Sequence, residues 1–293
     1  MATLLIVNAD DFGLEKEINT AVIRAHEEGI VTSASLLAVG DAFEHAVELA
    51  KKHPRLGVGA HLALTRGPSL KGKPLIGSET SSVTGGTGRF SKSPIIFAMR
   101  AALRLVDAGE LEKEFRAQLE RITSAGIPIT HIDSHQHIHL APPIFAIVIG
   151  LALEFGISWV RMPFAPVRTV GCNGDIGGKM KKALLRRLAA WNLRTLRGTK
   201  LRWADYHVGI EHAGCLREDA LLRVLQELPD AVVELSCHPG ADNAALNRDH
   251  PWGYCWREEL AALCSQETAA TVKRLGIRLV NYAGWDEEAA SPT

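Results

Sequence analysis

The chain has 293 residues, of which 46% are hydrophobic and 23% are charged, which is enough apolar sequence for one well-buried core of barrel size. Lys and Arg together number 33, as do Asp and Glu. The net charge is therefore zero and gives no electrostatic reason to expect a nucleic-acid partner. The five cysteines form no CxxC pair, and an odd number at irregular spacing argues against a disulfide framework.

The first residues, Met-Ala-Thr-Leu-Leu-Ile-Val-Asn, carry no basic stretch and no cleavage site, so we expect no signal peptide. The longest apolar run, residues 144–153, is far shorter than the roughly 20 residues needed to span a bilayer. We therefore expect a cytoplasmic protein.

Short apolar runs alternate with longer amphipathic segments along the chain. The first run, residues 4–8, predicts a strand, and the helical segment after it has Ile18, Ala21, Val22 and Ala25 on one face. The same alternation predicts further strands at 32–37, 57–62, 129–133, 158–161, 206–208, 231–236 and 277–281. It predicts further helices at 42–52, 110–125, 143–155, 217–228 and 257–275.

Seven or eight strands that alternate with helices, without a GxGxxG turn after the first strand, predict an α/β fold. We interpret it as a single-domain (β/α) barrel over residues 1–293, TIM-barrel-like but open to distortion, with a doubly wound sheet as the alternative. Two segments interrupt the alternation. Residues 67–94 predict a long loop that could serve as a lid, and residues 164–203 predict a basic helical insertion.

Polar side chains gather where the predicted strands end. They are Asp10 and Asp11 after the first strand, His61 at the third, His131, Asp133, His135, His137 and His139 around the fourth, Arg161 at the fifth and His238 after the seventh. In a parallel barrel these positions share the C-terminal face, where barrel active sites are built. The sequence therefore predicts an active site at that face.

One carboxylate with two or three imidazoles is a natural site for Zn²⁺ or a similar divalent ion. Such an ion would lower the pKa of a bound water towards about 7 and polarise a carbonyl oxygen. Because neighbouring side chains in a strand point in different directions, one carboxylate of Asp10 and Asp11 could bind the ion while the other accepts a proton.

Four motifs, in order along the chain, resemble the signatures of YdjC-like carbohydrate deacetylases. They are Asn-Ala-Asp-Asp-Phe-Gly at 8–13, Gly-Ala-His-Leu-Ala-Leu-Thr at 59–65, Thr-His-Ile-Asp-Ser-His-Gln-His at 130–137 and Cys-His-Pro at 237–239. The resemblance runs from residue 3 to about residue 282. It implies an enzyme that removes the acetyl group from N-acetylated sugars such as chitooligosaccharides.

The same resemblance implies a role for each site residue. Asp11, His61 and His135 would bind one metal ion, Zn²⁺ or Mg²⁺, and imidazole ligands favour Zn²⁺. Asp10 would be the general base, and His238 the general acid that protonates the departing amine.

Two more residues would act through these. Arg161 resembles an arginine that orients the base in the wider polysaccharide-deacetylase group, and Asp133 would hold a ligating imidazole in place.

Other interpretations stay open. Asp10 and Asp11, taken alone, could cap the helix that follows, and His238 could simply end a strand before a turn. An amidohydrolase or a phosphoesterase could use the same metal ligands. A non-catalytic carbohydrate-binding protein is a further alternative, but the presence of both carboxylates favours an active enzyme.

Residues 178–197 predict an amphipathic helix. Its apolar arc comprises Met180, Leu184, Leu185, Leu188, Trp191 and Leu196. Its basic arc comprises Lys179, Lys182, Arg186, Arg187, Arg194 and Arg197. The helix could pack its apolar arc on the barrel, or it could lie on an anionic membrane surface.

The length, this insertion and the apolar residues 142–153 resemble the hopanoid-biosynthesis-associated branch of the family. That resemblance implies an N-acetylglucosaminyl hopanoid as the substrate, reached by peripheral contact with the inner face of the membrane.

Overall fold

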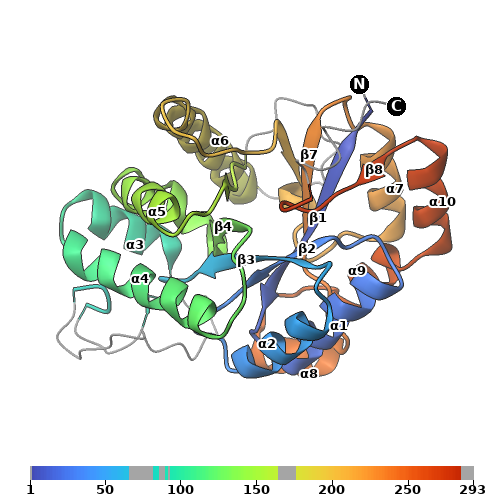
Figure 1. Ribbon diagram of the computed structural model, residues 1–293, viewed down its shortest axis with the longest axis horizontal. Helices are drawn as coiled ribbons and strands as arrows, with labels where there is room; N and C mark the ends of the chain where they lie inside the picture. The colour runs from blue at the N-terminus through green and yellow to red at the C-terminus, as the bar shows by residue number, and fades with distance from the viewer. Residues whose placement is uncertain (1, 66–81, 86–89, 92, 164–175, 285–293) are drawn as a thin grey trace.

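The computed structural model describes residues 2–65, 82–85, 90–91, 93–163 and 176–284, without the side chains of residues 176–182. Within this part of the chain the strands pair in parallel throughout and form one curled sheet, an open half-barrel surrounded by helices (Figure 1). The predicted α/β fold with a distorted (β/α) barrel is therefore confirmed.

The strands follow the sequence prediction closely. They are β1 (Leu4–Phe12), β2 (Ser33–Leu36), β3 (Gly57–Leu62), β4 (His131–Ser134), β5 (Trp159–Val160), β6 (Tyr206–Val208), β7 (Val232–Cys237) and β8 (Arg278–Leu279). Their order in the sheet is β5-β4-β3-β2-β1-β7-β6, with β8 paired to β1. A regular barrel would place β8 between β7 and β1, but here β7 pairs with β1 directly.

The position of β8 follows from the register. Leu4 and Leu5 pair with β7 on one edge and with β8 on the other, whereas β2 begins to pair with β1 only at Asn8. β8 therefore covers the part of β1 that β2 does not reach, and seven strands follow one another around the sheet.

The open edge of β5 is bridged by the chain that leads into β6. The N–H of Val160 donates to the carbonyl of Arg202 at 3.0 Å, and the N–H of Arg202 donates to the carbonyl of Ser158 at 2.8 Å. Since β6 then pairs with β7, this segment joins the two ends of the curled sheet.

Helices cover the outer side of the sheet (Figure 1). They are α1 (Lys16–Glu27), α2 (Phe43–Lys52), α3 (Pro94–Ala102), α4 (Ala108–Ser124), α5 (Pro142–Glu154), α6 (Ile176–Leu196), α7 (Glu218–Gln226), α8 (Asn243–Asp249), α9 (Trp256–Leu263) and α10 (Gln266–Arg274), with short 3-10 helices η1 (His135–Leu140) and η2 (Ile210–His212). None of the helices in the described ranges is both long and apolar enough to cross a membrane.

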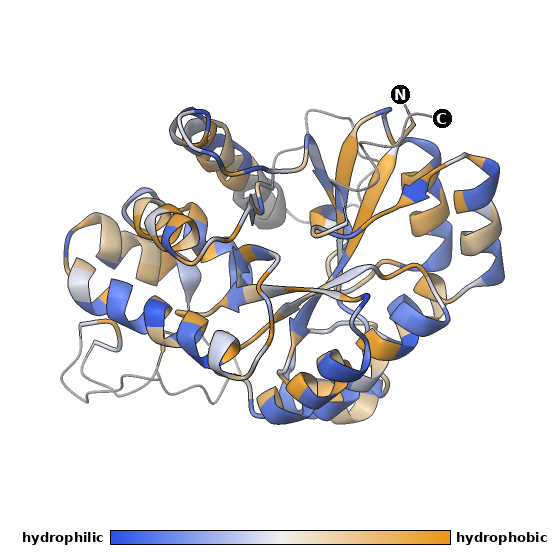
Figure 2. Ribbon diagram, in the orientation of Figure 1, coloured by the Kyte–Doolittle hydropathy of each residue, from blue (hydrophilic) through white to orange (hydrophobic). Residues whose placement is uncertain are grey.

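The two faces of the sheet differ in polarity because side chains alternate along a strand. Leu5, Val7 and Ala9 of β1 pack into the main core with the helices, and β1 and β7 are largely hydrophobic in Figure 2. The residues between them include Asn8 and Asp10, which are buried and polar. The same alternation occurs in β3, β4 and β7, so the concave side of the sheet is lined by polar residues that can form a site.

One expectation about the helices was wrong, and two further features of the helices had been left open by the sequence. The single helix predicted at 257–275 is two helices, because the Ser265 hydroxyl accepts from the N–H groups of Glu267 and Thr268 and starts α10. Helices α3 and α8 were not predicted. In α6, Leu184 and Trp191 do not belong to the buried arc, since they are 53% and 55% exposed, whereas Leu185 and Leu196 are buried.

The long loop predicted at 67–94 and the start of the basic insertion at 164–175 lie largely outside the described residues.

Candidate active site

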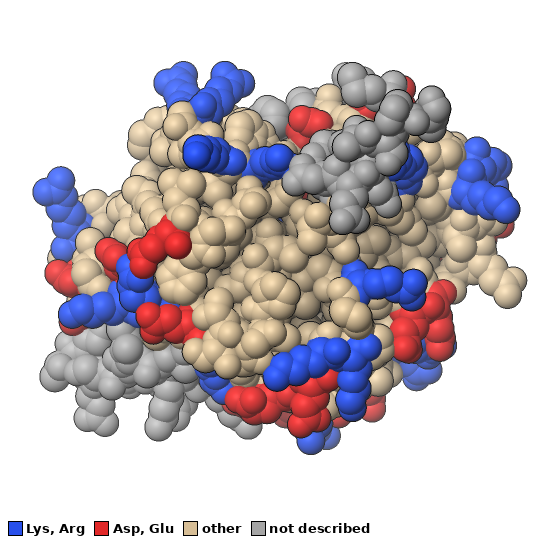
Figure 3. Space-filling model, in the orientation of Figure 1, with Lys and Arg blue, Asp and Glu red and all other residues tan. Residues whose placement is uncertain are grey.

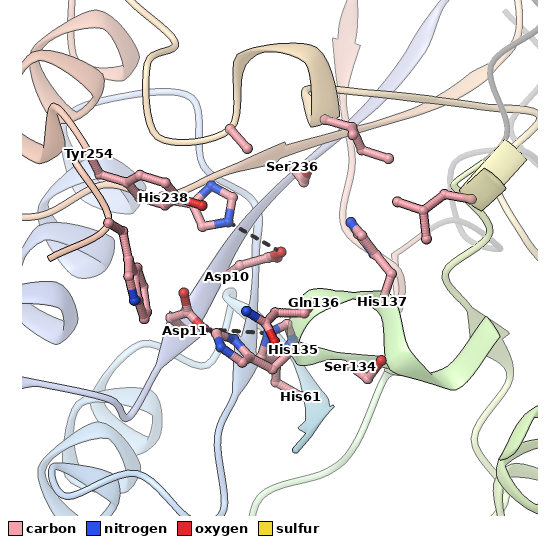
Figure 4. A pocket seen from close by; sticks show the side chains of 14 residues that line it. Asp10, Asp11, His61, Ser134, His135, Gln136, His137, Ser236, His238 and Tyr254 are labelled. Atoms are coloured by element: carbon pink, nitrogen blue, oxygen red, sulfur yellow. Dashed lines mark hydrogen bonds and ion pairs between the residues drawn. The ribbon is translucent and has the colours of Figure 1, made fainter. Parts of the chain in front are cut away.

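A cavity of about 200 Å³ lies at the carboxyl ends of the central strands (Figure 4). Its lining residues are Asp10, Asp11, His61, Ser134, His135, Gln136, His137, Leu185, Ile210, Ala213, Ser236, His238, Trp252 and Tyr254. The cavity therefore gathers the acidic and imidazole side chains that follow β1, β3, β4 and β7.

Asp10 and Asp11 both face the cavity because β1 is irregular where they stand. From Ala9 to Phe12, β1 advances by three residues while its partner β2 advances by only two. Within this bulge Asp11 has a positive φ of 63°. In a regular strand the two side chains would point to opposite faces. The bulge turns Asp11 back, so that both carboxylates line one cavity.

Asp11, His61 and His135 form a compact cluster of donor atoms. Asp11 Oδ1 lies 2.9 Å from His135 Nδ1 and 3.5 Å from His61 Nε2, and one donor atom of each residue lies within 4.8 Å of the others. Within the described part of the chain, His135 Nε2 is buried and has no hydrogen-bond partner. One carboxylate and two imidazoles suit a divalent ion such as Zn²⁺, so this triad is a candidate metal site.

The charges in this cluster shift one another's pKa values. Burial alone would raise the pKa of Asp11, but His135 and His61 lower it well below its usual range. Burial would lower the pKa of His61, but Asp133 and Asp11 raise it to about 10. The carboxylates around these imidazoles thus favour positive charge at the cluster, which is the property a cation site requires.

His135 is presented by an unusual turn at the end of β4. Gln136 and His137 have φ angles of 59° and 56°, which lie in the left-handed region that side chains other than glycine seldom adopt. The Ser134 hydroxyl lies 2.6 Å from His139 Nδ1 and accepts from the His139 N–H at 3.0 Å, which closes the turn. Backbone strain of this kind is common at ligand sites.

The remaining histidines of this run differ from His135. His131 and His139 are fully buried, and burial lowers their pKa to about 3 and about 4. Both are therefore neutral near pH 7, and His139 Nε2 lies 3.0 Å from the Arg161 carbonyl. His137 lines the cavity on the side away from Asp11 (Figure 4).

Asp133 connects the candidate metal site to a buried arginine. Its Oδ1 lies 2.8 Å from His61 Nδ1, so the His61 ring is held with Nε2 towards Asp11. Its Oδ2 lies 2.6 Å from Arg161 and accepts from the Ser35 hydroxyl at 2.9 Å. Asp10, His61 and Asp133 also lie close enough to suggest a metal site, but Arg161 already pairs with both of those carboxylates.

Arg161 is fully buried and holds Asp10 with both ends of its guanidinium group. Nη1 donates to Asp10 Oδ2 at 2.8 Å, Nη2 donates to Asp10 Oδ1 at 2.7 Å, and Nε donates to Glu234 at 2.5 Å. Burial would raise the pKa of Asp10, but Arg161 and His61 lower it below its usual value. Asp10 is therefore an ionised carboxylate in a fixed orientation.

His238 lies across the cavity from the metal triad, with Nε2 3.8 Å from Asp10 Oδ2 (Figure 4). Behind it is the buried carboxylate of Glu259 on α9, which accepts from the His238 backbone N–H at 2.6 Å and lies 3.9 Å from the ring Nδ1. Burial raises the pKa of Glu259 to about 7, although His238 acts against the rise.

Every site residue named from the sequence lies in or directly behind this cavity, but four contributors were missed. Glu234 and Glu259 place buried carboxyl groups behind Arg161 and His238, and Trp252 and Tyr254 form an aromatic wall. Glu234 could have been noticed as one acid inside the apolar run Val-Val-Glu-Leu. No local sequence pattern marks Glu259 or the two aromatic residues, because contacts between distant segments bring them to the cavity.

Comparisons with known proteins identify related sequences. A family model described as YdjC-like protein matches residues 4–274. A carbohydrate deacetylase of Brevibacillus brevis is 35% identical over 282 residues, which cover 95% of this chain and 98% of the relative. A carbohydrate deacetylase of Vibrio campbellii is 36% identical over 282 residues, which cover 95% of each protein.

A crystal structure from Enterococcus faecalis has a similar fold. That protein, assigned provisionally as a cellobiose-phosphate cleavage protein, is 26% identical, with a TM-score of 0.74 over 97% of this chain and 99% of the other.

Proposed function

The chain belongs to the YdjC-like family, and from that membership we propose that it is a carbohydrate deacetylase, which hydrolyses the N-acetyl group of an amino sugar and releases acetate and a free amine. The proposal is supported by relatives of nearly the same length that carry this name. The single observation that carries it is the candidate metal triad beside an ionised carboxylate that a buried arginine holds in place.

Asp11, His61 and His135 would hold the metal ion, and Asp133 would keep the His61 imidazole in the ligating orientation. When bound, a divalent ion would polarise the acetyl carbonyl and make water more acidic. Two imidazole ligands favour Zn²⁺, and Mg²⁺ is the alternative.

Asp10 is the general base in this proposal. It is ionised, it lines the cavity next to Asp11, and Arg161 fixes both of its oxygen atoms. A carboxylate held in this way accepts the proton of an attacking water without having to reorient. The Arg161 guanidinium group acts through Asp10 and does not line the cavity.

His238 would donate the proton that the departing amine requires. Its Nε2 lies 3.8 Å from Asp10 Oδ2, so base and acid stand side by side, where both can reach the same amide. Glu259 lies behind the ring, 3.9 Å from Nδ1, and accepts from the His238 backbone N–H, so it fixes the backbone that presents the imidazole. Trp252 and Tyr254 offer flat apolar faces against which a sugar ring can pack.

The finer substrate that we propose is an N-acetylglucosaminyl hopanoid, a sugar carried on a lipid and reached by peripheral contact with the membrane. This part of the proposal is supported by the resemblance of residues 142–153 and 164–203 to the hopanoid-associated branch of the family.

The test is acetate release from N-acetylglucosamine-bearing substrates, both soluble and hopanoid-linked, by metal-stripped and Zn²⁺-restored protein. We expect release only after metal is restored, with a preference for the lipid-linked sugar. If metal occupies the site and no substrate releases acetate, the amidohydrolase or phosphoesterase alternative gains support.

Asp10→Asn tests the base. We expect the variant to retain bound metal, measured by elemental analysis, because Asp11, His61 and His135 are unchanged. Its kcat should fall by roughly 10²–10⁴-fold, the usual contribution of a positioned acid or base. In contrast, His61→Ala should lose metal first. Near-normal turnover by Asp10→Asn would contradict the assignment of Asp10 as base.

A further inference from the structure

Helix α3 and the turn after it expose a row of large apolar side chains. Ile95, Ile96, Met99, Leu103 and Leu105 are between 57% and 66% exposed. No acidic residue occurs between Pro94 and Leu105. Isolated exposed apolar residues are common, but five on one short segment mark a contact surface.

Helix α6 exposes apolar and basic residues together. Leu184, Arg187, Trp191 and Arg194 follow one another at spacings of three and four residues, which places them on one side of the helix. Leu184 and Trp191 are more than half exposed. Among the described residues neither Arg187 nor Arg194 has an acidic partner, whereas Arg186 pairs with Glu211 at 2.8 Å. Figure 3 shows basic side chains over α6 at the upper left, with no acidic ones among them.

Helix α5 joins these two surfaces, since it packs against both α3 and α6. Its exposed residues are Pro143, Ala146, Gly150, Leu153 and Glu154. Only Glu154 is charged, and it is neutralised by Arg116. The exposed residues of α3, α5 and α6 therefore form a largely apolar surface. It carries arginines that have no acidic partner among the described residues, and we call it the α3/α6 face.

The α3/α6 face lies next to the cavity. Both α3 and α6 pack against η1, the segment that carries His135, and Leu185 of α6 is part of the cavity lining. The helices that carry this face therefore lie directly beside the candidate active site.

We propose that the α3/α6 face docks on the surface of a bilayer that contains anionic phospholipids. Apolar side chains, an exposed tryptophan and unpaired arginines are the combination that binds the interfacial region of an anionic membrane. A second copy of the same face fits poorly, because Arg187 and Arg194 would meet like charges. The docking is argued from this surface and deepens the proposed function, on which its role in reaching a lipid-linked sugar rests.

The test is sedimentation of the full-length protein with vesicles of phosphatidylcholine alone and of phosphatidylcholine with phosphatidylglycerol in equal parts. We expect stronger binding to the anionic vesicles, reduced by added salt. Arg187→Gln with Arg194→Gln should lower this binding roughly 25-fold, because each cation near an anionic surface contributes roughly fivefold. Ile95→Ser with Met99→Ser, and Trp191→Ala, should weaken binding to both kinds of vesicle.

Matched control variants carry the same changes elsewhere. Arg248→Gln on α8 and Leu275→Ser after α10 alter an exposed arginine and an exposed leucine far from the α3/α6 face, and they should bind vesicles like the unmodified protein. The proposal is overturned if the protein binds neither vesicle or both equally. It is also overturned if the α3/α6 variants bind like the controls, or if they convert a dimer into a monomer on gel filtration.

Acetate release from a soluble N-acetylated sugar is measured on the same samples. We expect the α3/α6 variants to retain it, since none of the altered residues lines the cavity. Loss of that reaction in all proteins would refute the proposed function, while the vesicle result would still report on docking.

Discussion

The φ of 63° at Asp11 and the bulge in β1 put two adjacent carboxylates on the same side of the strand. Asp10 is then bound by Arg161, while the Asp11 carboxylate pairs with the imidazoles of His61 and His135. Two neighbouring acids thereby acquire different partners, and different chemistry becomes available to each. Asn or Asp tolerates this backbone conformation better than most residues, which suits a carboxylate to the position.

Glu259 is the residue whose titration is easiest to test. Burial raises its pKa from 4.5 to about 7, so the folded protein holds this proton more tightly than the unfolded chain. The resulting stability is fully present below about pH 4.5 and is lost as the pH rises through about 7. A shift of this size corresponds to about 3 kcal/mol.

Glu259→Gln should remove that pH dependence, because an amide does not titrate in this range. Relative to the variant, the unmodified protein should lose about 3 kcal/mol of unfolding free energy between pH 4.5 and 7. Urea denaturation of both proteins at the two pH values measures the difference, and other titrating groups cancel because both proteins share them. Parallel pH profiles for the two proteins would show that Glu259 is not the titrating group.

At the scale of elements, the packing of β3 against β4 depends on the absence of a side chain at Gly59. A Cβ atom there would come within 2.4 Å of His131 ring atoms, and the His131 ring is itself stacked on Tyr282, with centroids 3.8 Å apart. The imidazole thus fills the space beside Gly59 and ties β4 to the residues after β8. His61, two residues further along β3, depends on this register.

Gly59→Ala should therefore lower the free energy of unfolding by about 1–3 kcal/mol, the usual effect of overfilling a packed interior. Gly150→Ala is the control, since no atom lies within 4 Å of its Cβ position in α5. It should stabilise the protein by about 0.5–1 kcal/mol, because alanine favours a helix. Chemical denaturation measures both, and equal effects of the two substitutions would refute the packing argument.

At the scale of the whole molecule, Arg161 connects strands that are distant in the sequence. Its guanidinium group binds Asp10 of β1, Asp133 of β4 and Glu234 of β7, all buried. Three carboxylates around one guanidinium group are tolerable inside the barrel only while the cation is present. The ionic network that orients the base is thus also part of what holds the curled sheet together.

Arg161→Met should lower the free energy of unfolding by about 3–5 kcal/mol, because it leaves buried carboxylates without a counter-charge. Arg161→Lys keeps the positive charge but lacks the planar guanidinium group, so its free energy of unfolding should lie between those of the unmodified protein and Arg161→Met. The exposed Arg223, paired with Asp219 on α7, gives the control Arg223→Met, with an expected change below about 0.5 kcal/mol. If Arg161→Met unfolded like the control, the network would have no structural role.

The sequence by itself determined the alternation of strands and helices and the polar residues that end the strands. Hydrophobic periodicity is a local property, so β3 and β6 were predicted with their observed bounds. The convergence of Asp10, Asp11, His61, His135 and His238 on one cavity was also predictable, because parallel strands present their carboxyl ends on the same side. The family resemblance selected His135 from its neighbours, which spacing alone could not do.

The tertiary structure decided what depends on contacts between distant segments. Strand periodicity ends at Ser134, since Gln136 and His137 adopt left-handed conformations, so the spacing of the histidines does not show that His135 faces Asp11. The same holds for Glu259 behind His238, for the placement of β8, and for the exposure of Trp191 on a helix whose pattern allowed either burial or exposure. Each of these features depends on contacts between segments that are distant in the sequence, and the sequence of one segment does not specify those contacts.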